Sequence, residues 1–94
     1  VAGTLRNRID VSPAATVFNE DSVDVDFRVE GNGDANLLYV DAGNDRIGIG
    51  TASPSELLDV YSGSTNARIQ VQTNNSSSVP AIEFRNTAAG CHYC

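Results

Sequence analysis

The sequence predicts an all-β fold made of short antiparallel strands and hairpins. Val is twice as common as either Leu or Ile, and β-branched residues favour a pleated strand over a helix. Apolar and polar residues alternate with a period of two in several stretches, and no stretch sustains a period of 3.6. Clusters of Gly, Asn, Asp and Ser separate these stretches and predict tight turns.

The clearest strand is predicted at residues 23–30, with a short strand expected before it at residues 8–11. Val23, Val25, Phe27 and Val29 alternate with charged residues and therefore share one face of the strand. A turn at residues 31–34 separates this stretch from a second one at residues 36–41. Together the two stretches predict a β-hairpin.

Residues 46–50 alternate Ile with Gly, so one face of this strand carries no side chains and should accept a close neighbour. Residues 53–56 have the form of a helix capping box and predict one helical turn at most. Residues 57–61 are again strand-like. Further strands are predicted at 67–72 and 81–85, with a polar loop at 73–78 between them.

Four segments follow from this pattern. Residues 1–17 are predicted to form an N-terminal extended segment or linker, and residues 18–61 a β module. Residues 62–90 are predicted to form a second, shorter β module, and residues 91–94 a C-terminal tail that contains a C-x-x-C motif.

The module at residues 18–61 resembles a repeat found in phage tail-fibre and tail-spike-like proteins. Its densest part is Arg-Ile-Gly-Ile-Gly-Thr at 46–51, followed by Ser-Pro at 53–54 and Leu-Asp-Val at 58–60. The runs at 17–20, 24–31 and 37–42 agree with the same pattern. In that family the repeat often precedes further fibre modules or a C-terminal intramolecular chaperone domain, whose catalytic residues have no counterpart here.

The resemblance implies an elongated, trimeric fibre module, an intertwined β-prism or a β-helix-like shaft, on a virion surface or otherwise outside the cell. Its partners would be copies of itself, adjoining fibre segments and, through other segments, a host cell-surface receptor. Gly48 and Gly50 would allow close approach between copies. The residues expected to face the core or the trimer axis are Val23, Val25, Phe27, Val29, Leu38, Val40, Ile47, Ile49, Leu58 and Val60.

The charge composition argues against nucleic acid as a partner. Twelve acidic residues stand against six basic ones, all Arg, for a net charge of -6, whereas binding to phosphate backbones needs clustered cations. No apolar run approaches the roughly 18 residues that cross a bilayer, so membrane insertion is not expected. Scattered acidic residues are typical of solvated faces and turns.

Cys91, His92 and Cys94 form a C-x-x-C motif that is found in redox pairs and in zinc sites. Two Cys and one His supply fewer than the four ligands of a closed zinc site, unless a trimer brings several copies together on its axis. We favour the simpler interpretation, in which these are ordinary or disulfide-forming terminal residues.

Asp41, Asn44 and Asp45, with Asp34 and Asn36 nearby in sequence, carry oxygen atoms that could bind Ca²⁺. Their spacing does not match an EF-hand loop, and Asn and Asp in turns need no metal. The sequence therefore predicts no cofactor, with calcium or zinc kept as alternatives.

No catalytic site is predicted. His92 is the sole histidine, and no nucleophile elbow or phosphate-binding loop occurs. The expected function is that of a structural fibre segment that spaces and presents a host-attachment assembly. A subunit of a secreted bacterial filament or adhesin is the alternative, in which residues 1–17 would pair with the sheet of the next protomer. A calcium- or carbohydrate-binding module ranks third.

Overall fold

The computed structural model describes residues 8–87, and within this range the protein contains β-strands and no helix. Six short strands form two sheets: β1 (Ile9–Val11) and β2 (Thr16–Phe18) make a hairpin, and β3 (Phe27–Val29), β4 (Leu38–Asp41), β5 (Arg46–Ile49) and β6 (Leu58–Val60) make a four-stranded sheet in that order. The predicted all-β class is confirmed.

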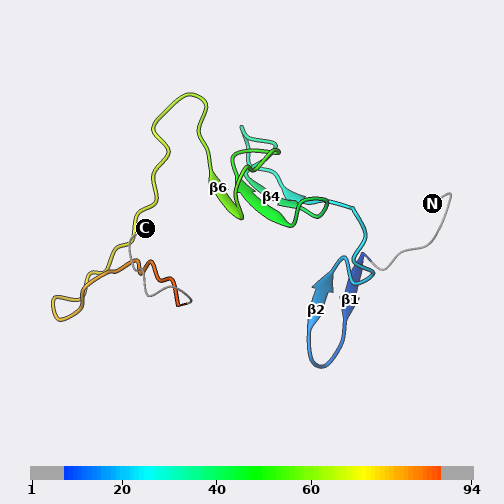
Figure 1. Ribbon diagram of the computed structural model, residues 1–94, viewed down its shortest axis with the longest axis horizontal. Coiled ribbons are helices and arrows are strands. Elements are labelled where there is room, and N and C mark those ends of the chain that lie inside the picture. Colours follow the sequence, from blue (N-terminus) through cyan, green and yellow to red (C-terminus); the bar gives the residue numbers. More distant parts are fainter. Residues whose placement is uncertain (1–7, 88–94) are drawn as a thin grey trace.

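Figure 1 shows the hairpin β1–β2 on one side of the four-stranded sheet. The chain leaves β6 on the other side and runs away from the sheet. The strands predicted at 67–72 and 81–85 do not form, because neither stretch is paired with another strand of residues 8–87. Alternation alone cannot make a strand, since the backbone N–H and C=O groups need a partner strand.

The predicted hairpin after residue 23 is present but shorter than expected. β3 and β4 pair antiparallel with Phe27 opposite Val40 and Val29 opposite Leu38. Residues 23–26 are not in the strand, which corrects the predicted start. Asn19 explains the difference: its side-chain amide donates to the carbonyl of Val23 at 2.8 Å and accepts from the N–H of Val23 at 3.2 Å, so the chain bends there.

β5 and β6 run parallel, which corrects the prediction of an entirely antiparallel fold. Parallel neighbours usually need a connection of a dozen or more residues, and here residues 50–57 suffice. The guanidinium of Arg46 donates to the carbonyl of Pro54 at 3.1 Å, which holds the returning chain beside the start of β5. Residues 53–56 form bends instead of the predicted helical turn, and Ser55 N–H donates to the Asp59 carboxylate at 3.0 Å.

The close neighbours of Gly48 and Gly50 lie in the same chain. A Cβ on Gly48 would overlap the backbone oxygen of Thr51, and a Cβ on Gly50 would overlap that of Tyr61. Gly50 also has a φ of +82°, a conformation that other residues rarely adopt. The expected close approach is therefore real, but the connection to β6 and the segment after it occupy the space in which another copy was expected.

No large apolar side chain is buried within residues 8–87. The chain exposes 7924 Å², whereas a compact protein of its mass would expose about 5,200 Å². Its radius of gyration is 17.7 Å, against about 12 Å for a compact chain of this length. The strands are thus arranged around an apolar surface that the chain itself does not close.

Candidate assembly surface

The four-stranded sheet gathers apolar side chains on one face, which we call the apolar face. Strand pairing places Phe27 opposite Val40, Val40 opposite Ile47, and Ile47 opposite Leu58, so these four form one row across the sheet. A second row begins two residues away along each strand and, because side chains alternate, lies on the same face. It consists of Val29, Leu38, Ile49 and Val60.

Eight of the ten residues predicted for the assembly core make up this face, and none of the eight is buried. Leu58 is 57% exposed, Val29 42% and Ile47 41%. Neighbouring side chains cover Val40 and Ile49 only partly. The apolar face is therefore ordered by the strands but accessible to a partner.

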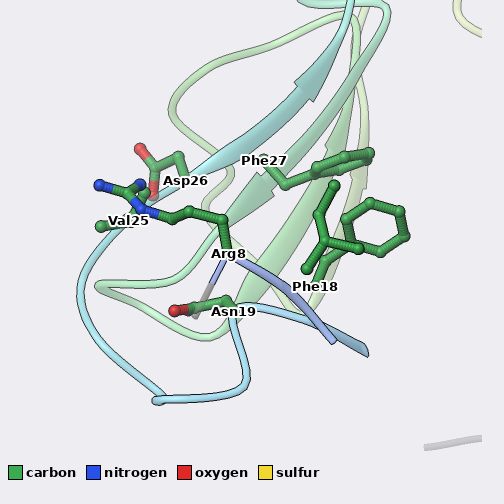
Figure 2. Close-up of a pocket in the computed structure, with 7 residues that line it drawn as sticks. Arg8, Phe18, Asn19, Val25, Asp26 and Phe27 are labelled. Carbon is green, nitrogen blue, oxygen red and sulfur yellow. The ribbon is translucent and has the colours of Figure 1, made fainter. Parts of the chain in front are cut away.

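The other two predicted core residues, Val23 and Val25, lie before β3 and outside the sheet. Val25 instead lines a hollow of about 220 Å³ between β3 and the hairpin β1–β2. Figure 2 shows the rings of Phe18 and Phe27 side by side at this hollow, with Arg8 extending toward Val25 and Asp26. The ring centroids of Phe18 and Phe27 are 4.8 Å apart, and the ring planes make an angle of 45°.

This aromatic contact joins the two sheets at one end of the apolar face. Phe27 is the first residue of the row that ends at Leu58, and Phe18 stands in β2. Neither the contact nor the hollow was predicted from the sequence. The sequence signal at this place is Ser12-Pro13, a pair that favours a turn. In the structure Ser12 and Ala15 exchange hydrogen bonds across this turn and fix the hairpin.

The opposite face of the sheet is polar. Its central row contains Arg28, Tyr39, Gly48 and Asp59, in that order across the strands. The hydroxyl of Tyr39 donates to the carboxylate of Asp26, and this hydrogen bond is the main cause of a pKa above the usual value for Tyr39. Asp26 also accepts from the N–H of Ala42 at 2.9 Å. Asp26 therefore ties the segment before β3 to the end of β4.

The candidate calcium ligands Asp41, Asn44 and Asp45 lie at the turn between β4 and β5. Asp41 accepts hydrogen bonds from the backbone N–H of Asn44 at 3.1 Å and from its side-chain amide at 3.0 Å. The side-chain hydrogen bond from Asn44 is the main reason why the pKa of Asp41 lies below its usual value. Asp45 has a φ of 56°, the left-handed conformation that Asp tolerates in turns.

Asp34 and Asn36 form a separate turn, in which the N–H of Asn36 donates to the Asp34 carboxylate at 2.8 Å. Across residues 8–87, no three His, Cys, Asp or Glu side chains come together in a group that could hold a metal ion. Cys91, His92 and Cys94 lie outside the described residues. Asp34 and Asp41 thus have turn-forming partners within the chain.

Comparison with known proteins gives no family. No protein-family model matches the chain, no curated protein matches it significantly, and no solved structure does so either. Residues 8–87 contain no helix with the length and apolar character of a membrane span.

Proposed function

We propose that this protein is a structural segment of a phage tail fibre or a similar appendage, in which copies of the chain associate through the apolar face and carry no catalytic activity. The observation that supports the proposal is the apolar face itself. Two rows of ordered apolar side chains are presented together; the Phe18 ring lies against Phe27 at one end of them, and none of the eight side chains is buried.

Residues 8–87 bury no apolar core, and the whole chain exposes about 2,700 Å² more than a compact protein of its mass would. Covering the apolar face with copies of itself would give the chain the core that it lacks alone, and the resemblance to tail-fibre repeats favours three copies around an axis on a virion or cell exterior.

The alternative is a subunit of a secreted filament or adhesin that polymerises by strand exchange. In the form of this alternative that the sequence predicts, residues 1–17 would pair with the sheet of the next protomer. Ile9–Val11 already pair with Thr16–Phe18 in the same chain, so that donation would first have to open a hairpin. The observation that favours exchange is a different one: residues 62–87 carry alternating stretches with no strand partner.

The mass of the native particle tests the proposal. Light scattering or native mass spectrometry should give three times the 9.9 kDa of one chain, and the mass should stay the same with chelator and with reductant. A distribution of masses that grows with concentration would favour the open filament. A monomer under all conditions would contradict both forms of assembly.

A further inference from the structure

The outer edge of β6 is an open strand edge. The N–H of Ile47 bonds to the carbonyl of Leu57, and the N–H of Tyr61 bonds to the carbonyl of Ile49, so the odd-numbered residues of this segment face β5. Because backbone groups alternate along a strand, those of Leu58 and Val60 face outward. Nothing between residues 8 and 87 is hydrogen-bonded to them.

The opposite edge of the sheet, at β3, is better protected. The Phe18 ring of hairpin β1–β2 packs against Phe27, and Arg28 and Glu30 form an ion pair at 3.0 Å beside it. Charged residues and covering elements are the usual devices that prevent one strand edge from pairing with another. β6 has no covering element among the described residues, so it is the edge at which a further strand can add.

Two stretches of the chain have the pattern of a strand and lack a partner. Residues 67–72 alternate Ala67, Ile69 and Val71 with Arg68, Gln70 and Gln72, and residues 81–85 alternate in the same way. Ile69 is 65% exposed and Phe84 66%. Each stretch could place apolar side chains on one face and polar side chains on the other when it pairs with an edge.

Charge distinguishes between the two stretches. The polar face of β6 carries Asp59, and opposite charges on paired strands stabilise pairing whereas like charges weaken it. The polar side of 67–72 offers Arg68, its single charge. The polar side of 81–85 carries both Glu83 and Arg85, which already form an ion pair with each other at 2.9 Å, so it offers no net charge to Asp59. The first stretch is therefore the complementary one.

We propose that residues 67–72 of one copy of this protein add to β6 of a second copy as the fifth strand of its sheet, with Arg68 opposite Asp59. This inference rests on the proposed function, because it assigns the contact between copies. The register is self-consistent in either strand direction. With Arg68 opposite Asp59, Ala67 and Ile69 fall opposite Leu58 and Val60, so the incoming strand extends the apolar face with the correct side.

The chain's own copy of the stretch does not make this pairing. Residues 67–69 and Val60 line a hollow of about 230 Å³, but no strand pairing joins them. Ser62 and Thr65 are hydrogen-bonded to each other in the connection between them, at 3.0 Å between their hydroxyl oxygens. The backbone of residues 67–72 has no strand partner within residues 8–87 and is available to another copy, and the chain that follows it leaves the sheet (Figure 1).

Disulfide trapping between two coexpressed copies tests the proposal. Both copies carry Cys91→Ser and Cys94→Ser, which removes the native cysteines; one adds Asp59→Cys and the other Arg68→Cys. Directly paired residues have Cα atoms about 4.5–5.5 Å apart, within the range that a disulfide spans. Oxidation should link the two copies, with the bond identified by peptide mapping. The control replaces Arg68→Cys with Ser78→Cys, in the polar loop, and should give roughly tenfold less linked product because its geometry is not fixed.

A second pair of positions avoids Asp59, whose carboxylate accepts from Ser55. Val60→Cys is combined with Ala67→Cys or with Ile69→Cys; the first should react if the strands are antiparallel and the second if they are parallel. Linkage of either pair between copies supports the proposal.

Three other outcomes would contradict the strand addition, and each has a different meaning for the proposed function. An assembled particle without these linkages would leave the proposed function in place and remove the strand addition. A double variant, Asp59→Cys with Arg68→Cys in one chain, that forms its disulfide only within that chain would show that the stretch closes its own sheet. A monomeric protein would contradict the proposed function and the strand addition together.

Discussion

The hydroxyl of Tyr39 in β4 donates a hydrogen bond to the carboxylate of Asp26, thirteen residues earlier in the chain. The same carboxylate accepts from the N–H of Ala42, so one side chain connects the segment before β3 with both β4 and the turn that follows it. Asp24 lies close by, because a Cβ on Gly43 would be 2.8 Å from its carboxylate. Asp26 therefore helps to position the edge strand β3, although its side chain is exposed as the alternation predicted.

The titration of Tyr39 should report this contact. The hydrogen bond favours the neutral phenol, so the pKa of Tyr39 is raised above its usual value near 10. The stabilisation is present at neutral pH and is lost as the pH rises through the raised pKa. The phenolate absorbance of the protein minus that of a Tyr39→Phe variant gives the titration of this group. Asp26→Asn should return its pKa toward the usual value; an unchanged midpoint would contradict the contact.

The turn between β4 and β5 should weaken in acid. Asn44 holds the pKa of Asp41 below the usual 3.8, so the contribution of Asp41 is complete above that pH and is lost as the pH falls through the lowered pKa. Carbon NMR of the Asp41 carboxyl group gives its titration midpoint. Asn44→Ala should raise this midpoint, whereas Asn32→Ala, in an exposed turn, should leave it unchanged.

A charge on the apolar face should prevent assembly. Ile47 lies between Val40 and Leu58 in the first row, and Ile47→Asp would bury an unpaired carboxylate between copies at a cost of several kcal/mol. The mass of the native particle should fall to that of one chain. Asn32→Asp adds the same charge in an exposed turn and should leave the mass as it is. A soluble Ile47→Asp assembly of unchanged mass would rule out this face as the interface.

Gly50 should not tolerate a side chain. Gly50→Ala combines a φ of +82° with overlap between the new Cβ and the backbone oxygen of Tyr61, and we expect a loss of about 1–3 kcal/mol in unfolding free energy. Gly33 provides the matched control, because a Cβ there would have no atom within 4 Å. Thermal or denaturant unfolding should give a lower unfolding free energy for Gly50→Ala than for Gly33→Ala. Equal stability would show that the segment after β6 does not pack against Gly50.

The sequence predicted the sheet where alternation and turn residues agree. The hairpin of β3 with β4 follows from local pattern, because two alternating stretches flank a run of Gly, Asn and Asp. The eight residues of the apolar face were also predictable, since period-2 alternation fixes which residues share a face.

The remaining features depend on contacts that alternation does not encode. Val23 and Val25 continue the pattern of β3, yet the Asn19 side chain competes for the backbone of Val23 and bends the chain. The parallel direction of β6 is accompanied by the hydrogen bond from Arg46 to Pro54, a contact that period-2 alternation does not predict. The stretch 67–72 has the pattern of a strand but has no strand partner within residues 8–87.

The strand order indicates that the sheet can form before chains associate. Every strand pairs with a neighbour in the chain, β1 with β2 and then β3 with β4, β4 with β5 and β5 with β6. Contacts between residues close in sequence form quickly, because little chain entropy is lost in closing their loops. The residues of the apolar face can thus reach their register while the polypeptide is still being synthesised. Encounters between chains would then begin from a sheet whose strands are already in register, and the slow, concentration-dependent stage of maturation would be the addition of residues 67–72 to a second copy.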